Sequence, residues 1–218
     1  MTTSSEDIIV DLNGNPVENS NEILVVGTSW VEQTIDVRYP WPHWCGIANI
    51  WGHAGVTIDA QAEYILDNYK GFKYIVWNLT HWHQSDPQGN GNYILPYDWG
   101  GQDTWGKLTR DIWFKKFTKQ PWYERTSALW IKAVIETVGN ENMLIYPIYR
   151  PSFNDHRWLK DYSCISDFHI GDERKEHGDG RGHCNQTGHQ LIAIRIAADI
   201  YAKWRIRCKI LNETIERS

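Results

Sequence analysis

Short apolar stretches alternate along this chain with longer patterns of helical spacing, and this alternation limits the possible folds more than any other feature. Four stretches are typical of buried strands: EILVVG (22–27), CGIANIWG (45–52), FKYIVWNLT (72–80) and NMLIYPIY (142–149). The spacing of apolar residues predicts helices at about 59–70, at about 126–138 and within 187–211. Strands joined by helices of this length run parallel in one sheet, so the sequence predicts an α/β fold.

The expected architecture is a flavodoxin-like three-layer α/β/α domain with a mainly parallel sheet of about five strands. The 218 residues, of which 41% are hydrophobic and 22% charged, suffice for one domain with a single core. We expect residues 1–20 to form an N-terminal tail and residues 21–218 to form the domain. The region at about 84–125 is rich in Gly, Asn, Asp, Pro and aromatic residues, which favours a long insertion over a linker between domains.

Composition excludes several classes of partner. A formal net charge of -5 provides no basic field for a phosphate backbone, so we expect no nucleic-acid partner. No apolar stretch is long enough to span a bilayer, and the N-terminus lacks a signal pattern. We therefore expect no membrane partner and a cytoplasmic location where the chain is synthesised. Four scattered cysteines without a C-x-x-C pair favour reduced thiols over a zinc or disulfide framework.

Ser29 follows the first apolar stretch, after Gly27 and Thr28, where the chain has to turn out of the sheet. Sites in sheets of this kind lie at the carboxyl ends of the strands, so the Ser29 hydroxyl is expected to face a cleft. The next residue, Trp30, is expected to be exposed there. The alternative for Ser29 is a purely structural role as a helix cap.

A serine nucleophile needs a base within hydrogen-bond reach and a third group that orients the base. Nine histidines are available, and His183 has the most suggestive context. It lies in the Gly-rich stretch GDGRGH, immediately before the strongest helical pattern, and Asp179 precedes it in the same stretch. A loop at this position can hold an imidazole over the end of another strand.

Two motifs resemble the first and fifth blocks of the SGNH, or GDSL-type, hydrolase superfamily. VVGTSWVE is similar to the first block, with Ser29 at the position of the nucleophile and Thr28 where Asp is commonest. DGRGHCNQTGHQLIA is similar to the fifth block, with His183 as the base and His189 in the trailing Gly-His pair. The family's acid lies three residues before the histidine, whereas Asp179 lies four before it.

The two middle blocks fit the family less closely. NIWGHAGVTID resembles the second block and places Gly55 where the family uses a backbone N–H as an oxyanion donor. In YIVWNLTHWH, which resembles the third block, Gly-x-Asn-Asp would fall on residues 80–83, so Trp82 stands in place of the asparagine. With Thr80 in place of the glycine, the third block resembles that of SGNH-like chains encoded by tailed bacteriophages. This resemblance implies association with a virion.

The resemblance implies a serine esterase or acylhydrolase that needs no cofactor and no metal. Ser29 would attack an ester carbonyl, His183 would take its proton and Asp179 would orient the imidazole. The backbone N–H groups of Ser29 and Gly55 would stabilise the oxyanion, with Thr80 or His81 replacing the absent asparagine. A catalytically degenerate SGNH-like module that binds carbohydrate or serves a structural role is the alternative.

Aromatic side chains in the expected insertion indicate a class of substrate. Tyr93, Tyr97, Trp99 and Trp105 lie in one polar stretch, and flat aromatic faces stack on sugar rings. A small-molecule or glycan ester, such as an O-acetylated carbohydrate, is therefore the expected partner. For most of the 13 tryptophans, packing within the protein is the simpler interpretation.

A metal site is a further alternative. His81 and His83, two positions apart in HWH, can share one face of a strand, and Asp86 follows them. No further ligand is evident in the sequence, so metal catalysis is not the expected mechanism.

Overall fold

The predicted apolar stretches form a four-stranded sheet in which every neighbouring pair of strands is parallel. The computed structural model describes residues 20–32, 37–52, 56–80, 121–148, 156–178 and 183–208. The strands are β1 (Ile23–Gly27), β2 (Asn49–Gly52), β3 (Tyr74–Leu79) and β4 (Met143–Pro147). They lie in the order β2-β1-β3-β4. Because the chain returns to the same end of the sheet between successive strands, all four carboxyl ends lie at one edge.

A further segment lies beside β4, where it makes a single parallel bridge between Ile145 and Ile165. The Ile145 N–H donates to the Cys164 carbonyl at 2.8 Å, and the Ser166 N–H donates to the Ile145 carbonyl at 2.8 Å. The part of the chain that the structure describes thus has four strands and this bridge, against the expected count of about five strands.

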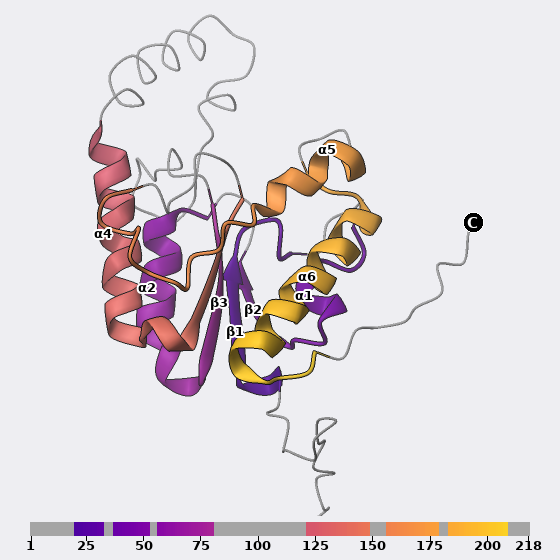
Figure 1. Ribbon diagram of the computed structural model, residues 1–218, viewed down its shortest axis with the longest axis horizontal. Coiled ribbons are helices and arrows are strands. Elements are labelled where there is room, and N and C mark those ends of the chain that lie inside the picture. The colour runs from indigo at the N-terminus through magenta and orange to yellow at the C-terminus, as the bar shows by residue number, and fades with distance from the viewer. Residues whose placement is uncertain are drawn as a thin grey trace, which may run out of the picture.

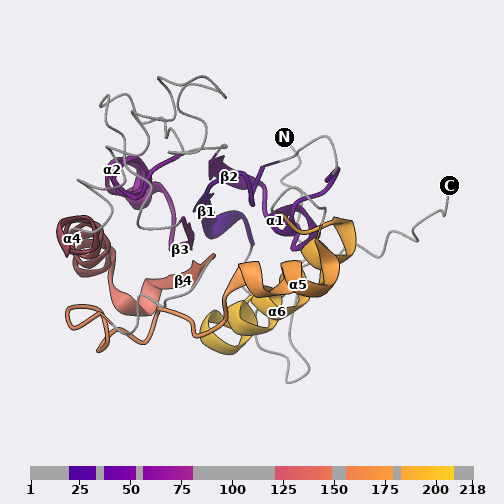
Figure 2. The same cartoon turned by 90° about the horizontal axis from the view of Figure 1, so that it is seen from above.

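Helices cover both faces of the sheet, as Figures 1 and 2 show. They are α1 (Trp41–Trp44), α2 (Ile58–Asn68), α4 (Pro121–Val138), α5 (Arg174–His177) and α6 (Gln186–Trp204). Short 3-10 helices are η1 (Ser20–Glu22), η2 (Tyr69–Gly71), η4 (Asn140–Asn142) and η6 (Ile170–Glu173). Contacts pair α2 with α4 and α1 with α6, which confirms the three-layer α/β/α architecture. Among the described residues, no helix has the length and apolar character needed to cross a membrane.

The observed helices differ from the expected ones mainly at their ends. The helix expected at about 126–138 begins earlier, so that residues 121–125, expected in the insertion, belong to α4. The helix expected within 187–211 runs from Gln186 to Trp204. The rest of the expected insertion, 84–120, and residues 1–19 of the expected tail lie outside the described residues.

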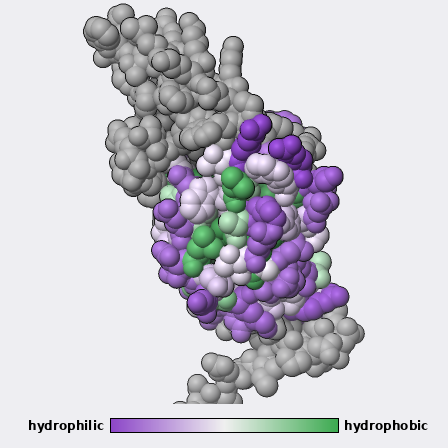
Figure 3. Space-filling view, turned by 90° about the vertical axis from the view of Figure 1, so that its left-hand side faces the viewer, coloured by the Kyte–Doolittle hydropathy of each residue, from purple (hydrophilic) through white to green (hydrophobic). Residues whose placement is uncertain are grey.

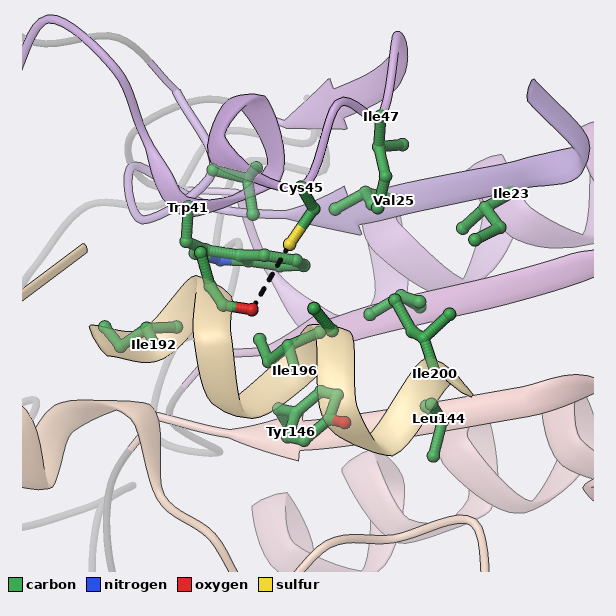
Figure 4. Packing of buried hydrophobic residues seen from close by; sticks show 14 of the residues in the cluster. Ile23, Val25, Trp41, Cys45, Ile47, Leu144, Tyr146, Ile192, Ile196 and Ile200 are labelled. Carbon is green, nitrogen blue, oxygen red and sulfur yellow. Dashed lines mark hydrogen bonds between the residues drawn. The ribbon is translucent and has the colours of Figure 1, made fainter. Parts of the chain in front are cut away.

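Alternate residues of each strand enter two separate apolar clusters, one on each face of the sheet. On β1, Ile23 and Val25 face α1 and α6, whereas Leu24 and Val26 face α2 and α4. Figure 4 shows the first cluster, in which Ile192, Ile196 and Ile200 of α6 pack on the strands. Burial on both faces explains why the strand sequences are almost continuously apolar.

The outer surface of the helical layer that contains α4 is mostly polar. Figure 3 views the molecule from the side of α4, where hydrophilic residues surround a small hydrophobic area. Leu129 of α4 is one of the exposed large hydrophobic residues, with 54% of its surface exposed.

Candidate active site

Ser29 and His183 meet at the carboxyl edge of the sheet. Ser29 Oγ lies 2.7 Å from His183 Nε2, and both side chains are only partly buried. Ser29 belongs to the turn that follows β1, which the Val31 N–H closes by donating to the Thr28 carbonyl at 3.0 Å. A serine hydroxyl and an imidazole nitrogen at this separation form the pair that nucleophilic catalysis requires.

The turn that carries Ser29 is tightly packed at its base. A Cβ added at Gly27 would lie 2.7 Å from Val31 Cγ1 and 3.1 Å from Asn78 Cβ, so the position is restricted to glycine by space. Asn78 lies on β3 and donates from Nδ2 to the Tyr146 carbonyl at 3.1 Å. Packing against the neighbouring strand therefore fixes where the chain leaves β1 and where the Ser29 hydroxyl lies.

The residues that directly follow His183 are tied to the end of α5. Gly178 and Cys184 form an antiparallel bridge, and the Asn185 N–H donates to the His177 carbonyl at 2.6 Å. Asn185 is also the N-cap of α6, because its Oδ1 accepts from the Gly188 N–H at 3.0 Å. These contacts anchor Cys184 and Asn185, which directly follow His183, to the end of α5 and to the first turn of α6.

Close contact between α6 and this loop depends on a second glycine. A Cβ added at Gly188 would lie 2.6 Å from Cys184 Cβ and 3.0 Å from His177 Cβ. The missing side chain lets the first turn of α6 approach the base of the loop. The Gly-His pair in the sequence therefore has a packing role beside His183.

Trp30 is buried, contrary to the expectation of an exposed side chain, with 2% of its surface exposed. Its ring centroid lies 5.5 Å from that of His183 and 6.0 Å from that of His189. His189 is 1% exposed and lies in the first turn of α6. The chain turns back after Ser29, so the indole enters the core rather than the solvent.

The first turn of α6 is also tied to the segment before α1. Gln186 Nε2 donates to the Tyr39 carbonyl at 2.7 Å, and the Tyr39 N–H donates to Gln186 Oε1 at 3.2 Å. Neither this pair nor the Asn185 cap was predicted from the sequence. The cap had a sequence signal, because an asparagine stands directly before a helical pattern, whereas the Tyr39 contact had none.

Of the other residues predicted for the site, the structure describes Thr80, whereas several lie outside the described ranges. Thr80 directly follows β3 at the same edge of the sheet and is 1% exposed. The described residues contain no group of three or more His, Cys, Asp or Glu that could hold a metal ion. Several residues named above lie outside the described ranges: Gly55, His81, Trp82, His83, Asp86, Tyr93, Tyr97, Trp99, Trp105 and Asp179.

No family model, curated protein or solved structure matches the chain. A function for it therefore has to be inferred from its own residues. The most informative of these are Ser29 and His183, which are joined by a hydrogen bond at the edge of a parallel sheet.

Proposed function

We propose that this chain is a serine esterase or acylhydrolase of the SGNH type, with Ser29 as the nucleophile and His183 as the general base. The observation that carries the proposal is the 2.7 Å separation of Ser29 Oγ and His183 Nε2. General bases act across separations of about 2.6–3.2 Å, so no rearrangement is needed for proton transfer between these two atoms. Their position at the carboxyl edge of a parallel sheet is where substrates reach such folds.

The reaction proceeds through a covalent acyl-enzyme. Ser29 Oγ attacks the ester carbonyl carbon while its proton moves to His183 Nε2, and a tetrahedral oxyanion forms. The C–O bond to the alcohol then breaks, and His183 returns the proton to the departing alcohol. Water attacks the acyl-Ser29 ester with His183 again as the base, which releases the carboxylic acid and restores the serine.

Two further roles, orientation of the imidazole and stabilisation of the oxyanion, are proposed from the resemblance alone. Asp179 would orient the imidazole, and the N–H groups of Ser29 and Gly55 would stabilise the oxyanion with help from Thr80 or His81. One oxyanion donor contributes about 2.7–4 kcal/mol to lowering the barrier, so the absent asparagine predicts slow turnover unless one of these side chains replaces it.

The proposed substrate is an ester of a small molecule or a glycan, with O-acetylated carbohydrate as the preferred class. This choice rests on the aromatic residues Tyr93, Tyr97, Trp99 and Trp105 in one polar stretch of the sequence. Association with a virion, which the likeness to phage-encoded chains implies, would bring such an enzyme to surface glycans.

Hydrolysis of aryl acetates and of a soluble acetylated glycan tests the proposal. Ser29→Ala and His183→Ala are each expected to lower kcat by about 10³-fold or more, because the pair acts as a unit. Ser163→Ala is the matched control, since Ser163 is exposed and its Oγ contacts Asn140. Turnover that persists in Ser29→Ala would show that another group performs the reaction.

A degenerate glycan-binding module is the second candidate, and the tryptophan at the asparagine position of the third block favours it. The two candidates differ in whether the bound ester is hydrolysed. The module would bind acetylated glycan without turnover, and Ser29→Ala would leave its affinity unchanged.

A further inference from the structure

The indole of Trp30 lies against the His183 imidazole. The two ring centroids are 5.5 Å apart and the planes are tilted by 53°. Trp30 directly follows Ser29, so consecutive residues provide the hydroxyl that His183 contacts and the ring that it packs on. Two neighbouring side chains of the same turn therefore contact the imidazole.

The same indole also contacts the first turn of α6. The His189 ring centroid lies 6.0 Å from that of Trp30, and the His189 N–H donates to the Asn185 carbonyl at 3.1 Å. Trp30 thus touches His183 in the loop and His189 in the helix that anchors this loop. At 2% exposed and packed within the core cluster, the indole cannot move without disturbing both contacts.

Charge adds a chemical reason for an aromatic residue at this position. When His183 takes the Ser29 proton it becomes a cation, and a cation that lies over the face of an indole ring, within about 6 Å of its centroid, is attracted by the electron-rich π system. This attraction is larger when the site is shielded from water, and it arises only after proton transfer. It therefore favours the transition state over the resting enzyme.

We propose that Trp30 is a positioning residue for the general base, holding the His183 imidazole in line with Ser29 Oγ and stabilising it once protonated. This role rests on the proposed function, because it concerns the proton transfer between Ser29 and His183. It goes beyond that function in assigning a specific task to the residue that follows the nucleophile.

Three variants separate this role from simple core packing. Trp30→Leu removes the aromatic ring, Trp30→Phe keeps a smaller one, and Trp41→Leu is the control. Trp41 is 0% exposed and belongs to the same apolar cluster, where it lies beside Cys45 (Figure 4). Loss of either tryptophan lowers the free energy of unfolding. The kinetics are therefore measured at a temperature well below the midpoint of thermal unfolding of each variant.

Trp30→Leu is expected to lower kcat about tenfold while KM changes by less than about twofold, because the attraction between the indole and the protonated imidazole forms only in the transition state. Trp30→Phe is expected to recover kcat to within about threefold of the wild type. Trp41→Leu is expected to leave kcat within about twofold. Equal kcat values for Trp30→Leu and Trp41→Leu would overturn the proposal.

A second measurement does not depend on turnover. The NOE between the His183 ring protons, assigned with His183→Gln, and the Ser29 β-protons is expected to weaken in Trp30→Leu and to persist in Trp41→Leu, because it reports the distance between the two side chains rather than the ring current of the indole. An unchanged NOE in Trp30→Leu would contradict the positioning role. If the wild type neither hydrolyses esters nor reacts with serine-directed probes, the proposed function fails, and the NMR signals alone decide whether Trp30 holds the imidazole.

Discussion

Ser29 Oγ and His183 Nε2 are in hydrogen-bond contact at 2.7 Å although 154 positions separate the two residues along the chain. The contact exists because the turn after β1 and the loop before α6 both end at the same edge of the sheet. Gly27 allows the first to pack against β3, and Asn185 fixes the second to the start of α6.

Removing the cap of α6 is expected to loosen the loop that holds His183. Asn185→Ala deletes the Oδ1 that accepts from the Gly188 N–H, and the loss of an N-cap lowers the free energy of unfolding by about 1 kcal/mol. Asn185→Asp keeps an acceptor at the same place and serves as the control. Urea unfolding of both variants measures the difference, and equal stability of the two would contradict the role of the cap.

Adding a methyl group beneath the Ser29 turn is expected to displace it. In Gly27→Ala the new Cβ lies 2.7 Å from Val31 Cγ1, and overpacking of this kind costs about 1–3 kcal/mol of stability. Ester turnover is expected to fall as well, because the hydroxyl moves away from His183. Gly71→Ala is the control, since nothing lies within 4 Å of a Cβ added there. If the two alanine variants behave alike, the turn is not held by this packing.

The four thiols are expected to differ in reactivity. Interaction between the Cys45 and Cys208 thiols lowers the pKa of Cys208 and raises that of Cys45, and burial raises the pKa of Cys45 further. Cys208 is also partly exposed, whereas the other three cysteines are buried. Limiting iodoacetamide at about pH 8, followed by peptide mass spectrometry, should label Cys208 first. Cys45→Ala should slow this labelling, and an unchanged rate in Cys45→Ala would contradict the thiol pair.

Stability is expected to fall in alkaline solution, in part because of Cys164. Burial raises the pKa of this thiol to about 11, so the folded protein retains its proton more strongly than the unfolded chain does. The stabilisation is complete below about pH 9 and is lost as the pH rises toward about 11, with a maximum near 2–3 kcal/mol. Urea unfolding under reducing conditions should show a smaller alkaline loss for Cys164→Ala than for the wild type, whereas parallel curves would exclude this thiol as a cause.

Much of the fold follows from local pattern, because strands buried on both faces must be almost wholly apolar. The stretch 22–27 contains β1, and 142–149 contains β4, as expected. The segment around Ile165 makes only one bridge and has no apolar run, so no pattern revealed it. Helix α1 is a single turn, too short for periodicity to indicate.

The candidate site was predictable only in part. Motif order suggested that Ser29 and His183 would meet, and the structure places them in contact. The burial of Trp30 was not predictable, because the direction of a side chain after a turn depends on distant packing rather than on neighbouring sequence. The link between Gln186 and Tyr39 likewise joins segments that no local pattern connects.

The most direct measurement is covalent labelling with a fluorophosphonate probe, read by intact mass and by the modified peptide. We expect a single adduct on Ser29 that is absent in Ser29→Ala, forms much more slowly in His183→Gln and is unaffected in Ser163→Ala. A folded wild-type protein that stays unlabelled, or that carries the adduct on another residue, would contradict the assignment of Ser29 as the nucleophile.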